Sequence, residues 1–180
     1  MAYTLKIEEA MPDAWPTVAT DLASASTAFL GAVWQRLESF IAWRWGERVC
    51  VFIVEGPGVW VPPLTPVTIT TSQVWTEAGE WEAVALAPSA YGGFDLKKVG
   101  PYRFTTTLGS TDDPPPAVQE AFRRLAHYLA EQDGREAGMV ETALDGLGAF
   151  KFAPGPMAAK SLVYSGAGDL LRPYRKLGAS

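Results

Sequence analysis

The stretch Asp112–Gln132, DDPPPAVQEAFRRLAHYLAEQ, carries the clearest helix signal in the chain. An aspartate can cap a helix by accepting hydrogen bonds from the first turn, and proline is tolerated at the first helical position. Gly134, just after the stretch, is a residue that can end a helix in the left-handed conformation. We therefore predict a helix over 114–132 with Asp112-Asp113 as its cap. Its apolar residues recur every three or four positions and share one face: Val118, Ala121, Phe122, Leu125, Tyr128 and Leu129.

A second helix is predicted upstream, over residues 24–45. Ser24 or Ser26 can cap it, and Gly46 is a natural stop. The helical spacing of its apolar residues predicts a face that packs in the core: Phe29, Val33, Leu37, Phe40, Ile41 and Trp45. Residues 1–23 carry no clear pattern beyond a possible short helix between Pro16 and Ala23.

Between the two helices the hydrophobic period changes to that of strands. Strands are predicted over 49–54, 59–61, 67–75, 81–86 and 102–107, with a turn at Gly56-Pro57-Gly58. Alternation along the third strand places one set of residues on a common face: Val67, Ile69, Thr71, Gln73 and Trp75. Short connections favour antiparallel pairing.

The order of elements predicts an α+β fold, with helices packed on a small antiparallel β-sheet and an extended C-terminal arm. The 180 residues are enough for a single domain with a core of its own. We place that domain at residues 1–160 and the arm at 161–180.

Charge divides the chain into an acidic body and a basic end. The net charge is −5; residues 150–180 carry five cations and one acid, and the remaining 149 residues carry 10 cations and 19 acids. The basic end is either a solvated terminus or a segment that docks onto an acidic surface. No apolar run reaches the roughly 20 residues of a membrane helix, and the N-terminus lacks a signal-peptide pattern.

Residues suited to catalysis or metal binding are few. His127 is the one histidine and Cys50 the one cysteine, so we expect no metal, no cofactor and no catalytic residue. The Gly56-Pro57-Gly58 turn lacks the lysine of a phosphate loop. The seven tryptophans could stack on sugars only if several shared one exposed surface. Core packing and subunit interfaces explain them better.

Four stretches, in their order along the chain, resemble the head–tail connector (adaptor) proteins of long-tailed phages and gene transfer agents. They are 37–49, LESFIAWRWGERV; 60–69, WVPPLTPVTI; 100–104, GPYRF, with the proline-capped helix after it; and 165–176, SGAGDLLRPYRK. The last stretch, with two leucines before Pro-Tyr-Arg, is the most specific. The first 23 residues depart from the pattern, since the family's opening helix is not clear there.

The resemblance implies a virion protein without catalytic activity, located in the neck between capsid and tail and in the host cytoplasm during assembly. It implies a ring of twelve copies below the portal, with DNA passing through the channel without sequence recognition. The implied partners are the portal protein, a stopper or other neck or tail protein, and further copies of the chain. The C-terminal arm would reach the portal through six residues: Leu170, Leu171, Arg172, Pro173, Tyr174 and Arg175.

Three alternatives stay open. The chain could be a neighbouring neck component, such as a stopper or tail-completion protein. It could be a small enzyme that uses His127. Within the adaptor hypothesis, Leu170 and Leu171 could cap the chain's own core instead of anchoring it to a partner.

Overall fold

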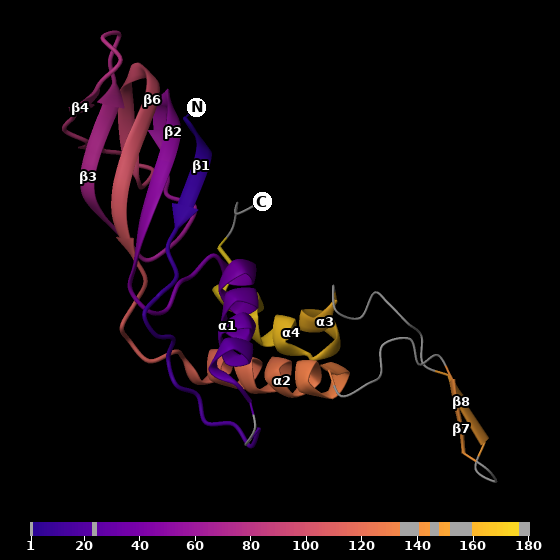
Figure 1. Cartoon of the computed structure of the whole chain (residues 1–180). Helices are drawn as coiled ribbons and strands as arrows, with labels where there is room; N and C mark the ends of the chain where they lie inside the picture. Colours follow the sequence, from indigo (N-terminus) through magenta and orange to yellow (C-terminus); the bar gives the residue numbers. More distant parts are fainter. Residues whose placement is uncertain (1, 23–24, 134–140, 145–147, 152–159, 177–180) are drawn as a thin grey trace. The chain divides into compact units, whose positions relative to one another are not determined.

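The computed structural model describes residues 2–22, 25–133, 141–144, 148–151 and 160–176 (Figure 1). Its helices are α1 (Thr27–Ile41), α2 (Pro116–Asp133), α3 (Ser161–Tyr164) and α4 (Ala167–Leu171), followed by the 3-10 turn η1 (Arg172–Tyr174). Its strands are β1 (Tyr3–Glu9), β2 (Arg48–Trp60), β3 (Val67–Trp75), β4 (Trp81–Ala83), β5 (Ala87–Pro88), β6 (Phe94–Leu108), β7 (Glu141–Leu144) and β8 (Gly148–Lys151). The predicted α+β class is confirmed.

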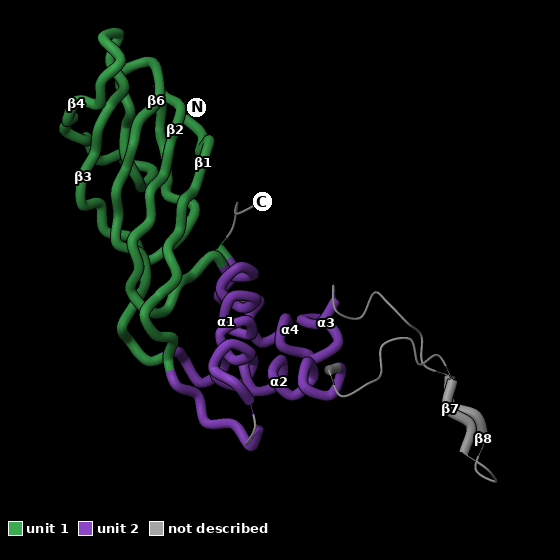
Figure 2. The backbone as a smooth tube through the Cα atoms, in the orientation of Figure 1, with its two compact units in different colours: residues 1–16, 42–113, 176–180 green, residues 17–41, 114–175 purple. Residues whose placement is uncertain are grey.

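The chain forms two compact units, shown in Figure 2. Unit 1 comprises residues 1–16, 42–113 and 176–180, and unit 2 comprises 17–41 and 114–175. This division differs from the predicted domain at 1–160 with an arm at 161–180. Residues 161–174 are mostly helical. Their helices pack on α1 and α2, which come from distant parts of the sequence, so this segment belongs to unit 2.

Unit 1 is built on one antiparallel sheet. Its strand order is β1-β2-β6-β3-β4, and β5 pairs with β6. The central pair, β2 with β6, runs in register from Arg48 opposite Leu108 to Gly56 opposite Gly100, then shifts and continues to Trp60 opposite Phe94. β7 and β8 form a separate two-stranded sheet. Gly134, the predicted end of the helix at 114–132, lies outside the described residues.

The turn predicted at Gly56-Pro57-Gly58 is wrong. β2 continues through this segment with a register shift. The unmatched residues of β6 are 97–99, between Leu96, which pairs with Gly58, and Gly100, which pairs with Gly56. The Tyr102 hydroxyl accepts a hydrogen bond from Lys98 N (2.7 Å) and donates one to Lys98 O (3.1 Å), which stabilises the irregular segment. A Cβ at position 56 would lie 2.7 Å from the Tyr102 ring, so a glycine is needed for this close approach.

The common face predicted for β3 holds for Val67 and Ile69 but is wrong for the residues after Thr70. Ile69 pairs with Thr106 and Thr71 with Thr105, so Thr70 is an extra, bulged residue. A bulge reverses which side chains point to which face. Val67 and Ile69 therefore pack on the core, whereas further along Val74 is the buried residue and Trp75 is 42% exposed.

Aromatic rings fill the core of unit 1. The Trp60 ring stacks on Phe104 with centroids 4.4 Å apart and meets Phe52 edge-on at 5.5 Å. The Trp60 Nε1 group donates to Thr4 Oγ1 (3.0 Å), which links β1 to the core. Cys50 is fully buried in the same cluster.

One carboxylate joins two nearly buried arginines beside the sheet. Glu9, at the end of β1, accepts hydrogen bonds from Arg44 Nε (2.6 Å) and Arg48 Nη1 (2.9 Å). The arginine side chains are only 9% and 3% exposed, and Glu9 is 23% exposed. The Arg48 guanidinium also lies over the Trp15 ring. The acidic N-terminal segment thus supplies a counter-charge for the Arg44–Arg48 stretch.

In unit 2, α1 and α2 pack through their apolar faces. The rings of Trp34 and Phe122 lie 4.7 Å apart.

Helix α1 is capped by Ser26, whose Oγ accepts from Phe29 N (3.2 Å), but it ends at Ile41. Ala42 takes a left-handed conformation (φ 58°), so the predicted stop at Gly46 is wrong. Most of the predicted face of α2 is fully buried: Val118, Ala121, Phe122 and Leu125.

The predicted cap of α2 is also wrong. The helix begins at Pro116, which leaves Asp112 and Asp113 too far upstream for the N-cap position. Asp112 instead accepts a hydrogen bond from Ser110 Oγ (3.0 Å). The Gln119 side chain donates to Pro114 O (2.8 Å) at the start of the helix.

Replacing Glu9 with Gln should lower the free energy of unfolding by about 2 kcal/mol, because two nearly buried guanidinium groups lose their carboxylate. Urea denaturation would measure the loss. Glu8→Gln is the matched control, since Glu8 pairs with Lys6 at the exposed surface, where ion pairs contribute little. Equal stabilities of the two variants would show that the Glu9 network is not stabilising.

Cys50 should resist alkylation in the native protein. Burial, with a smaller contribution from the Glu9 carboxylate, raises the pKa of its thiol to about 12. At pH 8 the reactive thiolate is therefore scarce, and we expect labelling by iodoacetamide to be slower than in urea by at least about a hundredfold. Since the chain has one cysteine, all labelling reports on this site. Similar rates in both states would contradict the buried position.

Candidate functional site

The six residues predicted to bind the portal have different environments in unit 2. Leu171 is fully buried, so it belongs to the chain's own core, and Leu170 is partly buried. Arg172, Pro173 and Tyr174 form the exposed turn η1, with Tyr174 40% exposed. Leu171 therefore packs in the chain's own core, and the exposed members of the predicted set are the η1 residues and Arg175.

Small residues position this turn. Gly166 adopts φ 71° between α3 and α4, a conformation that favours glycine. Ala167 is fully buried, and a Cβ at position 168 would lie 3.1 Å from Leu162 O. The small-residue run before the two leucines thus allows α4 to turn back tightly on α3. Leu171 then anchors the segment, and η1 follows at the surface.

Arg175 and Lys176 follow the turn and are already engaged within the chain. The Arg175 guanidinium lies 5.4 Å from the centre of the Phe40 ring on α1. Lys176 Nζ donates to Pro62 O (2.6 Å), and partial burial lowers the pKa of this ammonium group. Lys176 is therefore less available to a partner, whereas Arg175 is exposed, as Arg172 is.

An open groove lies between α1 and α3. It encloses about 740 Å³ and is lined by Phe40 and Leu162 together with polar side chains. Arg36 Nη1 donates to Ser161 Oγ (2.8 Å) across it. Phe40 also supports Arg175, so the groove and the C-terminal segment share one aromatic residue. Sequence reasoning missed this groove, because α3 is a single short turn with no periodic signal.

His127 lies on α2 with its Nε2 atom against the Asp21 carboxylate. Asp21 is 82% exposed, so this is a surface pair. In the described ranges His127 has no serine or cysteine partner that it could activate as a nucleophile. The structure assembles no catalytic arrangement around it there.

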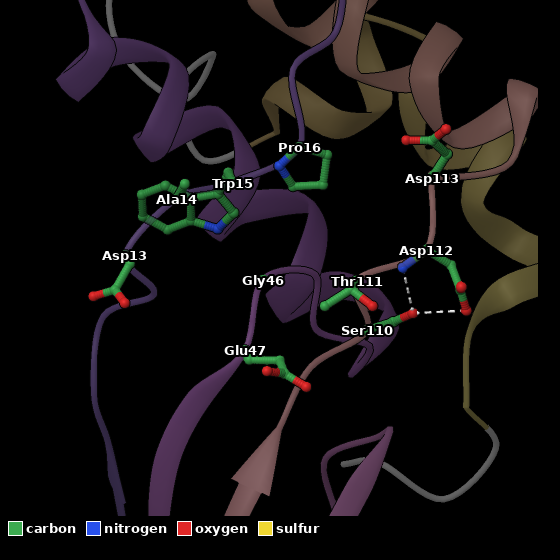
Figure 3. Close-up of a pocket in the computed structure, with 10 residues that line it drawn as sticks. All are labelled: Asp13, Ala14, Trp15, Pro16, Gly46, Glu47, Ser110, Thr111, Asp112 and Asp113. Carbon is green, nitrogen blue, oxygen red and sulfur yellow. Dashed lines mark hydrogen bonds between the residues drawn. The ribbon is translucent and has the colours of Figure 1, made fainter.

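A second cleft, of about 350 Å³, lies in unit 1 beside the first residues of β2 (Figure 3). Four carboxylate residues line it: Asp13, Glu47, Asp112 and Asp113. Ser110 Oγ is committed to Asp112, since it donates to the carboxylate and accepts from Asp112 N (3.0 Å). Across the part of the chain that the structure describes, no group of three His, Cys, Asp or Glu side chains is arranged to hold a metal ion.

The described helices include none that is both long enough and apolar enough to cross a membrane.

Comparisons with known proteins give similarity at the level of the fold. No protein-family model matches the sequence, and no curated protein sequence matches it. A chain from the neck of an empty gene transfer agent particle, computed with C6 symmetry, has a TM-score of 0.57 and 20% identity, over 96% of both chains. A chain from the virion of a native gene transfer agent particle has a TM-score of 0.55 and 18% identity, over 95% of both.

A third chain comes from the neck of a native gene transfer agent particle computed with C12 symmetry. Its TM-score is 0.52 at 19% identity, over 84% of this chain and 81% of that one. At these low identities the comparisons show a shared fold. This chain therefore has the fold of proteins found in the neck and virion of gene transfer agent particles.

Proposed function

We propose that this chain is a structural subunit of a virion neck. In this role it is an adaptor: copies form a ring below the portal, link the capsid to the tail, and surround a channel through which DNA passes. The observation that carries the proposal is the fold match to a neck chain over 96% of both chains. Because the match covers nearly the whole of both chains and not a local motif alone, it supports a similar structural role in an assembly.

The symmetry of the similar particles supports a ring. One neck was computed with C12 symmetry and another with C6 symmetry. Twelve copies around the channel agree with both, since a twelvefold ring contains sixfold symmetry. The net charge of −5 suits a channel protein, because carboxylates repel the phosphates of passing DNA and prevent it from adhering.

The role proposed here is non-catalytic. His127 makes a surface pair with Asp21, and the acidic cleft of unit 1 has its serine bonded to a neighbouring aspartate.

The portal contact that we propose centres on η1. Arg172 and Tyr174 are exposed, belong to residue types that dominate binding energy at interfaces, and stand on a segment anchored by buried Leu171. The anchoring matters because a preorganised turn loses less conformational entropy on binding than a free tail. Pro173 stiffens the same turn.

The double variant Arg172→Glu, Tyr174→Ala should bind purified portal protein of the same particle at least about tenfold more weakly, because it removes two interface anchors and reverses one charge. Surface plasmon resonance would measure the affinity. Asp169→Asn, an exposed substitution on the neighbouring α4, serves as the control and should bind normally.

Both variants should unfold at the wild-type urea concentration, because neither removes a buried side chain. A double variant that is as stable as wild type and binds portal equally well would rule out η1 as the contact. Truncating the chain at residue 165 would be less informative, since it also removes buried Ala167 and Leu171.

A further inference from the structure

Four side chains form a continuous group at the β3–β4 hairpin, which we call the tryptophan platform: Gln73, Trp75, Trp81 and Arg103. The rings of Trp75 and Trp81 meet edge to face with centroids 5.0 Å apart. The Arg103 guanidinium lies 4.6 Å from the centre of the Trp81 ring. Its Nε and Nη2 atoms both donate to Gln73 Oε1, at 2.9 and 2.6 Å. Three strands thus contribute to one connected surface.

Strand register places this platform on the face of the sheet that points away from the core of unit 1. Arg103 alternates with buried Tyr102 and Phe104, and it stands opposite Gln73 on β3 and Ile53 on β2. The same face of β2 continues with β-branched residues, namely Val49, Val51 and Ile53. Val49 is 56% exposed and Trp75 42% exposed. The platform is therefore the polar and aromatic end of a longer apolar stripe.

Such a surface has the composition of an interface centre. Tryptophan and arginine are enriched there, whereas lysine and glutamate are depleted and stay at the rim. Here the rim consists of exposed glutamates in the loop of the same hairpin, Glu77 and Glu80. Those carboxylates oppose the docking of nucleic acid, whose phosphates they would repel. A protein surface is the partner that fits an aromatic centre with an acidic rim.

Arg103 defines what that partner must offer. Among the described residues its polar partner is the neutral Gln73, and no carboxylate lies within ion-pair distance. Its guanidinium is held by Gln73 and Trp81, so little side-chain entropy remains to be lost on binding. A carboxylate in an apolar environment on the partner would give the Arg103 guanidinium an ionic partner, since arginine prefers planar acceptors of this kind.

We infer that the tryptophan platform contacts a second copy of this chain and forms a copy–copy interface of the ring. This inference rests on the proposed ring. A closed ring needs two different, complementary surfaces on each copy, because neighbours are related head to tail. The platform and its apolar stripe supply one of the two. An acidic chain with a net charge of −5 supplies many carboxylates for the other.

Site-directed photocross-linking tests the inference in assembled particles. An epitope-tagged chain carries benzoylphenylalanine in place of Trp75, and the control carries it in place of Tyr91, which is 89% exposed and outside the platform. Particles are purified, the tag is detected before irradiation, and the cross-linked products are identified by mass spectrometry. We expect covalent dimers of this chain from position 75 and at least about fivefold fewer from position 91.

The outcomes separate the two proposals. If the tagged chain is present but position 75 cross-links only to another protein, to DNA or to nothing, the platform inference fails and the neck proposal stands. If the tagged chain is absent from purified particles, the proposed function fails and the inference with it.

A charge reversal provides the second measurement. Arg103→Glu should lower the yield of tailed particles by at least about tenfold, because a carboxylate would then face a carboxylate across the interface. Lys97→Glu, an equal charge change at an exposed position of β6, should leave the yield unchanged. Wild-type yield from an Arg103→Glu chain that folds normally by circular dichroism would overturn the inference.

Discussion

The pairing of β2 with β6 is the constraint on which unit 1 depends. These are its two longest strands, and their register decides which side chains enter the core. It buries Phe52, Phe104 and Tyr102 on one face and sends Ile53 and Arg103 to the other. One-residue slippage would exchange the two faces. The buried core and the exposed tryptophan platform are thus two consequences of one register.

Unit 2 depends on residues from distant parts of the chain. Helix α1 comes before the sheet in sequence, and α2, α3 and α4 come after it. Trp34 on α1 meets Phe122 on α2, and fully buried Leu171 closes the C-terminal segment onto its own unit. Because Leu171 is buried, η1 is presented at the surface from a fixed base. A binding role proposed for the C-terminus therefore concerns a turn anchored by Leu171 more than an extended arm.

The sequence predicted the elements with a strong local pattern and missed those that depend on long-range pairing. The face of α2 and the Ser26 cap of α1 follow from helical spacing and cap chemistry, and both were found in the structure. The β3 bulge at Thr70 and the passage of β2 through Pro57 have no local signature, because only the partner strand makes them possible. β1 has no clear local signal, because its pattern is interrupted at Leu5 and its Glu9 carboxylate is paired with the distant Arg44 and Arg48.

The candidate sites show the same division. Motif resemblance selected the segment containing η1, but only packing separated buried Leu171 from exposed Arg172 and Tyr174. The composition of the chain favours cores or interfaces for the tryptophans, and Trp34 and Trp60 are in cores. That Trp75 and Trp81 meet beside Arg103 depends on the β3–β4–β6 register, which spacing alone could not predict.

The most direct test of the central claim is electron cryomicroscopy of particles assembled with an epitope-tagged copy of this chain and decorated with a tag-specific antibody fragment. The account predicts a ring of label at the neck, between the portal and the tail, with copies of the chain side by side around a central channel. Label elsewhere on the particle, or none on particles that contain complete necks, would contradict it.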